Sequence, residues 1–132
     1  MGAKMNRLVL LSAVAASALL GASMVSAQDV ENGAEVFKRC RACHDVGEGA
    51  KNKVGPILNG IVGRKAGTIE GFAYSEANKK AGADGWVWTD EKMMEYLLNP
   101  RTAMPGNKMA FAGIRDEQDR KDLIAYLKTF PK

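Results

Sequence analysis

The stretch Cys40-Arg41-Ala42-Cys43-His44 limits the possible folds most, because it holds both cysteines and the only histidine of the 132-residue chain. Two thiols and an imidazole this close together serve a metal site, a redox pair or a covalently attached group. The chain offers no further cysteine or histidine to complete a four-ligand site. Whatever these side chains bind must therefore be completed by another kind of ligand.

The first 27 residues are predicted to be a cleaved secretory signal peptide. Lys4 and Arg7 precede an apolar run over 8–20, and small residues lead up to Ala27, where cleavage is expected. An uncleaved membrane anchor is the alternative, but the run is shorter than the ~20 apolar residues that a spanning helix needs. Cleavage leaves one domain, residues 28–132.

The charge of this domain is close to balance. Without Lys4 and Arg7, 17 basic residues face 15 acidic ones, a net charge of +2. Domains that bind nucleic acid have a larger and more clustered basic excess, so no nucleic-acid partner is expected. A domain of 105 residues also has a small core for its surface, and a bound group can supply what the core lacks.

Hydrophobic spacing predicts an all-α domain of a few helices and irregular loops, without the alternation typical of strands. A first helix is expected over 29–44, a second over 89–99 and a third over 116–128. The segment 45–88 is predicted to be mostly irregular, with one short helix near 75–81. So long an irregular segment indicates that something besides the chain organises it.

The C-x-x-C-H spacing predicts covalent attachment of one haem c. Cys40 and Cys43, about one helical turn apart, would form two thioethers to the haem vinyl groups, and His44 would bind the iron. Structural zinc usually needs four Cys or His ligands, and a redox dithiol expects a βαβ context. A plain disulfide would leave His44 without a role, so haem is favoured.

The second axial ligand is predicted to be a methionine, because no other histidine exists. Met93 and Met94 lie at core spacing on a predicted helix. Met104 and Met109 lie in a predicted loop after a helix end, where a thioether can be held against an iron. Residue chemistry alone does not choose between these two.

Several stretches, in order, resemble the class I cytochromes c, closest to the bacterial cytochrome c2 carriers and their mitochondrial relatives. They are CRACH, NKVGPILNGIVGRKAG, GFAYSEANK, MMEYLLNP, PGNKMAFAG and DLIAYLKTF, and they cover most of residues 29–132. The resemblance implies the class I cytochrome c fold, with helices and loops wrapped around one haem c. It also implies that the metal ligands are His44 and Met109, the last residue of P-G-x-K-M, and that Met104 packs in the core.

The resemblance implies further cofactor-binding residues. The Pro56 carbonyl would accept a hydrogen bond from the His44 ring, while Tyr96 and Asn78 would tune the methionine side. Phe111 would shield the haem edge. Three residues would surround a haem propionate: Arg64, Tyr74 and Trp88.

The chain departs from the family pattern at a few positions. Trp86 competes with Trp88 for the propionate contact, and Trp88 is chosen because it keeps register with the following helix. Asn107 stands where threonine is usual, so an amide replaces the hydroxyl that would contact a propionate. Thr102 replaces a lysine that displaces methionine at high pH in relatives, so Lys108 becomes the candidate for that exchange.

The resemblance implies a periplasmic, monomeric electron carrier and not an enzyme. A cytochrome bc complex would be the donor, and a photosynthetic reaction centre or terminal oxidase the acceptor. Basic residues would ring the exposed haem edge and attract these membrane complexes: Arg39, Arg41, Lys53, Arg101 and Lys108. Two alternatives stay open, a dedicated electron acceptor of a periplasmic dehydrogenase and a haem-based ligand sensor or peroxidase.

Overall fold

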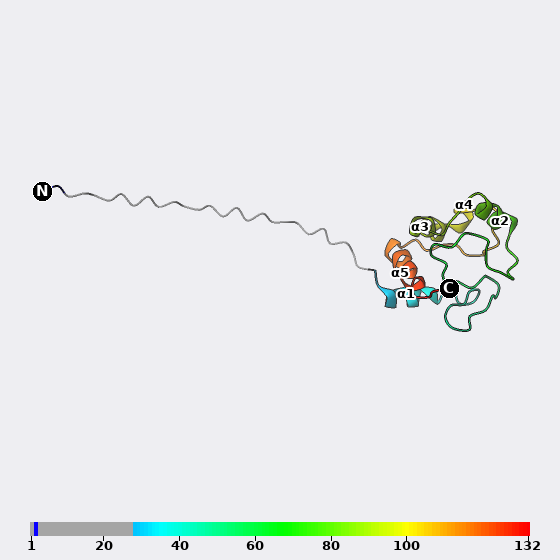
Figure 1. Cartoon of the computed structure of the whole chain (residues 1–132), viewed down its shortest axis with the longest axis horizontal. Coiled ribbons are helices and arrows are strands. Elements are labelled where there is room, and N and C mark those ends of the chain that lie inside the picture. Colours follow the sequence, from blue (N-terminus) through cyan, green and yellow to red (C-terminus); the bar gives the residue numbers. More distant parts are fainter. Residues whose placement is uncertain (1, 3–27) are drawn as a thin grey trace.

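A computed structural model describes residue 2 and residues 28–132; the rest of the predicted signal peptide lies outside the described residues. The helices of the described part are α1 (Val30–Phe37), α2 (Glu76–Ala83), α3 (Asp90–Leu98), α4 (Pro100–Ala103) and α5 (Glu117–Leu127). Helices α1 and α5 lie side by side, and α2, α3 and α4 gather on the other side of the domain (Figure 1). The all-α prediction is confirmed.

Each helix begins at a side chain that accepts a hydrogen bond from a backbone N–H of the first turn. The capping residues are Asp29, Ser75, Thr89, Asn99 and Asp116. These short polar side chains satisfy donors that have no partner inside the helix. The helix starts predicted near 29, 89 and 116 are therefore confirmed, and the short helix expected over 75–81 is α2.

Two local predictions are wrong. Residues 100–103 were expected to be loop, but Asn99 caps a new turn whose first residue is Pro100, a position that needs no N–H donor. The first helix was expected to run to His44, but α1 ends at Phe37. The Cys40 N–H then donates to the Phe37 carbonyl (2.8 Å) and the Cys43 N–H to the Cys40 carbonyl (3.1 Å). These tighter i to i−3 bonds, followed by one i to i−4 bond from the His44 N–H to the Cys40 carbonyl (2.8 Å), hold the motif in a run of turns instead of a continuous α-helix.

Helices α1 and α5 cross at Gly33. A Cβ atom at this position would lie 2.1 Å from the Asp122 carbonyl oxygen and 2.7 Å from the Tyr126 Cβ. Only glycine therefore permits this close approach. One turn later, the Phe37 and Tyr126 rings pack with their centroids 5.5 Å apart.

A buried carboxylate fixes the start of α1 on α5. Asp122 is only 2% exposed, and its Oδ1 accepts from the Asp29 N–H and the Gln118 amide, each at 2.8 Å. Its Oδ2 accepts from the Asn32 amide, also at 2.8 Å. Burial alone would raise the pKa of this carboxyl, but the three donors together lower it, because they stabilise the charged form.

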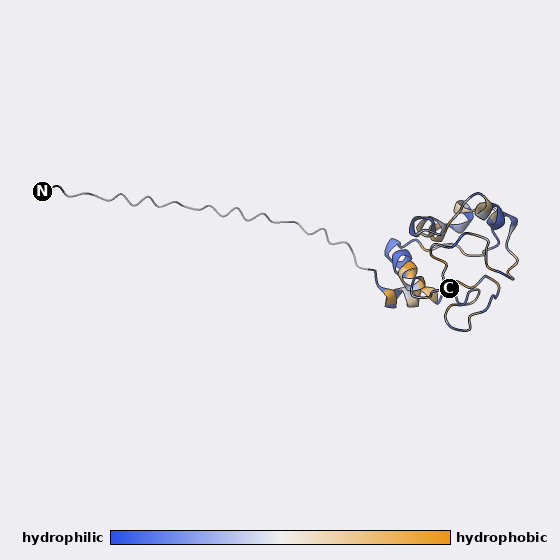
Figure 2. Cartoon of the chain, viewed as in Figure 1, coloured by the Kyte–Doolittle hydropathy of each residue, from blue (hydrophilic) through white to orange (hydrophobic). Residues whose placement is uncertain are grey.

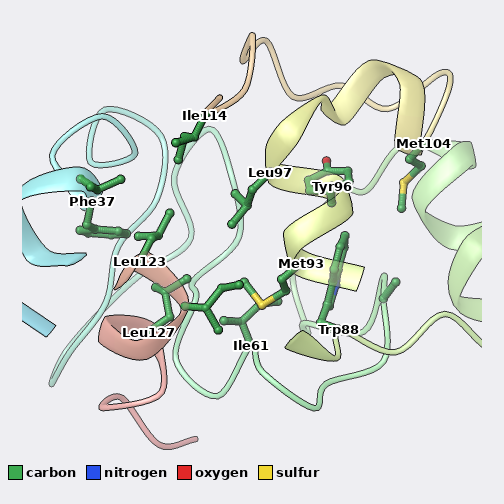
Figure 3. Close-up of a cluster of buried hydrophobic side chains, with 13 residues drawn as sticks. Phe37, Ile61, Trp88, Met93, Tyr96, Leu97, Met104, Ile114, Leu123 and Leu127 are labelled. Carbon is green, nitrogen blue, oxygen red and sulfur yellow. The ribbon is translucent and has the colours of Figure 1, made fainter. Parts of the chain in front are cut away.

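The hydrophobic core extends from the α1–α5 pair to α3. Figure 3 shows Phe37, Leu123 and Leu127 at one end of the cluster and Trp88, Tyr96 and Met104 at the other. Both α1 and α5 carry hydrophilic as well as hydrophobic residues (Figure 2), as helices with one buried face do. None of the helices in residues 28–132 is long and apolar enough to cross a bilayer.

The predicted irregular segment is held by hydrogen bonds between loops. The Leu58 N–H donates to the Asp45 carbonyl (3.0 Å), and the Gly60 N–H donates to the Phe130 carbonyl (2.8 Å). An isolated antiparallel bridge pairs Lys65 with Val87. The loops therefore follow defined paths without regular secondary structure of their own.

Candidate haem site

The imidazole of His44 is fixed by the backbone of the loop that follows the motif. Its Nδ1 lies 2.7 Å from the Pro56 carbonyl oxygen, which can only accept, so Nδ1 carries the proton and Nε2 keeps a free lone pair. A Cβ atom on Gly55 would lie 2.4 Å from the ring Cε1, so glycine is needed there. Burial lowers the pKa of His44 despite the Pro56 bond, which favours the neutral ring that metals bind. The predicted Pro56 contact is present.

The two cysteines lie beside this histidine as free, half-buried thiols. Burial raises the pKa of the Cys40 thiol to about 11. Catalytic dithiols have lowered pKa values, so this environment does not fit a redox pair. Among residues 28–132, no three His, Cys, Asp or Glu side chains are grouped closely enough to hold a metal ion.

Two aromatic residues position the sulfur of Met109. The Tyr96 hydroxyl lies 4.0 Å from Met109 Sδ, and the Trp88 ring packs edge-on against the Tyr96 ring with centroids 4.8 Å apart. Burial raises the pKa of Tyr96 to about 12, so its hydroxyl keeps the proton that it directs at the sulfur. Met104 is 4% exposed and belongs to the core cluster, whereas Met109 is half-buried at its margin.

Arg64 and Trp88, both predicted near a propionate, are joined through the backbone. The Trp88 N–H donates to the Arg64 carbonyl at 2.9 Å. The Arg64 guanidinium donates to the carbonyls of Asn59 (3.1 Å) and Ile57 (3.2 Å). Burial lowers the pKa of Arg64, with the neighbouring Tyr74 acting in the opposite direction. Tyr74, the third residue predicted near a propionate, is also buried.

Among residues 28–132, three buried side-chain atoms lack hydrogen-bond partners: Asn78 Oδ1, Trp86 Nε1 and, on α5, Arg120 Nε. Unpartnered buried polar groups are rare and indicate a missing ligand or water. Asn78 was predicted to contact the cofactor, whereas Trp86 was set aside in favour of Trp88, whose ring is 5.5 Å away. The free thiols and the oriented imidazole fit a haem held by Cys40, Cys43 and His44.

Two further residues border the methionine loop. The Phe111 N–H donates to the Met109 carbonyl at 3.0 Å, and the half-buried Phe111 ring packs against the core. Asn107, noted in the sequence only as a departure, accepts a hydrogen bond from the Met109 N–H at 2.8 Å. Its place two residues before Met109 was the available signal, because asparagine side chains often bond the backbone two residues on.

Comparisons with known proteins identify the family of the chain. The family model described as Cytochrome c matches residues 30–131. The chain is 57% identical over 105 residues to a cytochrome c2 of Blastochloris viridis, covering 80% of each chain. It is 62% identical over 98 residues to a cytochrome c-550 of Ancylobacter novellus, covering 74% of this chain and 92% of the relative.

A solved structure of cytochrome c2 from Rhodospirillum centenum superposes with a TM-score of 0.73 at 45% identity, covering 79% of this chain and 99% of that one. The resemblance read from the motifs and the class I cytochrome c fold are thus confirmed. The family match together with the spacing of Cys40 and Cys43 establishes one covalently bound haem c. The chain belongs to the cytochrome c family of electron-transport proteins.

Proposed function

We propose that the protein is a periplasmic electron carrier in which His44 and Met109 are the two axial ligands of the haem iron. One observation carries this proposal: each candidate ligand atom has its own orienting group. Pro56 holds the protonated Nδ1 of His44 at 2.7 Å and leaves Nε2 free, and the Tyr96 hydroxyl is directed at Met109 Sδ.

A bound haem supplies a one-electron Fe(III)/Fe(II) couple. The thioether of Met109 is a soft ligand that favours the reduced state and so raises the reduction potential. The Tyr96 hydroxyl acts in the same direction, because a hydrogen bond to sulfur withdraws electron density from it. Two protein ligands leave no open position for a substrate, which favours a carrier over an enzyme.

Arg64 is suited to compensate the charge of a haem propionate. Its guanidinium is largely buried and already fixed by the carbonyls of Asn59 and Ile57. Because the Arg64 guanidinium is already held in place, it needs to move little when the charge of the haem changes on electron transfer. We place Tyr74 and Trp88 in the same polar group, Asn78 with Tyr96 on the methionine side, and Phe111 at the haem edge.

The partner surface is formed by exposed basic residues around the motif and the methionine loop: Arg39, Arg41, Lys53, Arg101 and Lys108. None of these five residues takes part in an ion pair within residues 28–132, although the Lys53 ammonium donates a hydrogen bond to the Arg41 carbonyl. Exposed Ala110 and Ala112 add small apolar contacts beside Lys108. This surface suits fast, salt-sensitive docking to acidic faces of a cytochrome bc complex and of a reaction centre or oxidase. Cleavage after Ala27 would release residues 28–132 into the periplasm as a monomer.

The ligation is tested by the absorption spectrum of the ferric holoprotein. We expect a low-spin spectrum with the weak far-red band of methionine bound to iron, and Met109→Ala should erase that band. Met104→Ala is the matched control: it should keep the band while lowering the free energy of unfolding by about 2–5 kcal/mol, because it empties a core position. A high-spin spectrum in the unaltered protein, with ready carbon monoxide binding on reduction, would instead support a ligand sensor.

The docking surface is tested by the rate of electron transfer from a purified cytochrome bc complex at several salt concentrations. Lys53→Gln and Lys108→Gln together should slow the reaction and flatten its salt dependence. Lys121→Gln paired with Lys128→Gln is the control, since it removes the same charge from α5 and its C-cap, where both lysines are already ion-paired. Equal effects of the two double variants would contradict the proposed surface.

A further inference from the structure

The loop that carries Met109 is closed by the side chain of one residue, Asn107. A Pro105-Gly106 pair reverses the chain, with Gly106 at φ +86°, and the Asn107 N–H donates to the Met104 carbonyl at 3.2 Å. Proline followed by glycine with positive φ is the usual chemistry of a type II turn. The turn brings the Asn107 side chain back over the end of α4.

The Asn107 amide then makes three hydrogen bonds. Its Nδ2 donates to the carbonyls of Pro100 and Met104, both at 2.8 Å. Its Oδ1 accepts from the Met109 N–H, also at 2.8 Å. The side chain thus links both ends of α4 to the backbone of the ligand residue.

Asparagine is suited to this task because its side chain has two donor hydrogens and one acceptor. A threonine hydroxyl has one donor hydrogen and cannot bond two carbonyls as a donor. Helix α4 follows α3 directly, and α3 carries Tyr96, whose hydroxyl reaches Met109 Sδ. The backbone of Met109 is therefore linked to α4 through Asn107, and its sulfur contacts α3 through Tyr96.

We infer that Asn107 is a positioning residue that keeps the Met109 loop closed and so opposes displacement of the methionine by other ligands. This inference rests on the proposed ligation by Met109. Opening the loop breaks the hydrogen bond between Asn107 Oδ1 and the Met109 N–H, which costs free energy. A variant without this side chain has no such bond to break. The loop should then open more readily while the rest of the fold is unchanged.

The test measures the affinity of the ferric holoprotein for imidazole at constant pH, a ligand that must displace the methionine. Asn107→Ala should bind imidazole at least tenfold more tightly than the unaltered protein. Asn107→Ser, which keeps an acceptor for the Met109 N–H but cannot reach both carbonyls, should lie in between. Thr102→Ala is the control, because Thr102 is exposed in the same region and its N–H is capped by Asn99.

A double-mutant cycle separates positioning from general stability. In a Met109→Ala background, where no sulfur is left to displace, Asn107→Ala should leave imidazole affinity unchanged. A normal far-red band with unchanged imidazole affinity in Asn107→Ala would overturn this inference alone, as would an equal gain in the Met109→Ala background. Absence of the band from the unaltered protein would overturn the ligation by Met109 and this inference with it.

Discussion

The α1–α5 pair and the irregular segment 45–75 are held together in different ways. At the crossing, Gly33 allows two helices to touch, and a buried carboxylate, Asp122, ties the start of α1 to α5. The irregular segment instead depends on scattered bonds between loops and contains no helix. The first region is held by contacts within the chain, and we expect the second to depend on the haem as well.

This difference explains how a small domain combines rigidity with a redox site. The helix pair supplies a scaffold held by the close approach at Gly33 and by the hydrogen bonds of Asp122. The loops position His44 and Arg64 through backbone carbonyls, which give directed bonds without needing a large core. The covalent cofactor then contributes apolar area that the chain lacks.

The largest expected effect comes from removing the cofactor attachment. The double variant Cys40→Ala, Cys43→Ala should yield a largely unfolded haem-free protein, because the irregular half loses the group that organises it. Denaturant titration followed by circular dichroism should show no cooperative transition. A haem-free product that unfolds cooperatively would contradict the claim that the irregular segment needs the haem to fold.

Breaking the scaffold should have the next largest effect. Gly33→Ala places a Cβ 2.1 Å from the Asp122 carbonyl oxygen, so α1 must move away from α5. We expect a loss of about 3 kcal/mol in the free energy of unfolding of the holoprotein. Glu35→Ala, on the exposed face of the same helix, should cost less than about 0.5 kcal/mol. Similar losses in the free energy of unfolding for Gly33→Ala and Glu35→Ala would argue against a tight crossing at Gly33.

The Asp122 network should show a characteristic pH dependence. Asp122→Asn leaves an amide against the Asn32 donor and should cost about 1–3 kcal/mol at pH 7. Since folding lowers the pKa of Asp122, its stabilisation is present above the unfolded value of about 4 and is lost as pH falls through the folded pKa.

The difference in the free energy of unfolding between the unaltered protein and Asp122→Asn should therefore shrink below about pH 4. Denaturant titrations at several pH values measure it, and Asp84→Asn, an exposed carboxylate at the end of α2, is the control. If the difference in the free energy of unfolding stays constant down to pH 2, the charge of Asp122 is not what stabilises the α1–α5 pair.

The smallest effect on stability is expected from Tyr96→Phe. The hydroxyl has a long contact to sulfur, 4.0 Å, so its loss should change the free energy of unfolding by less than about 1 kcal/mol. The reduction potential should fall, because the donor to Met109 Sδ is gone. A rise in potential by voltammetry would speak against this role.

Sequence reasoning succeeded where the signal is local. The caps Asp29, Thr89 and Asp116 act within one turn, and the C-x-x-C-H spacing is itself the attachment chemistry. It failed at the end of α1, where a change from i−4 to i−3 bonds leaves no mark in hydrophobic spacing. The role of Asp122 was also out of reach, because its partners Asp29 and Asn32 are 93 and 90 positions away.

The site shows the same division. The resemblance supplied Pro56 and Tyr96, and their contacts to His44 and Met109 are present. The triple bonding of Asn107 depends on the exact path of the turn at Gly106 and on α4, which was expected to be loop. Departures from a family pattern are thus where the structure adds most.

The identity of the second axial ligand is tested most directly by nuclear magnetic resonance of the reduced holoprotein with labelled methionine methyl groups. Residues 28–132 contain four methionines, Met93, Met94, Met104 and Met109. We predict that one methyl signal is shifted far upfield by the ring current of the adjacent haem and that Met109→Ala alone removes it. Four signals at ordinary positions, or a shifted signal that belongs to Met104, would contradict axial ligation by Met109.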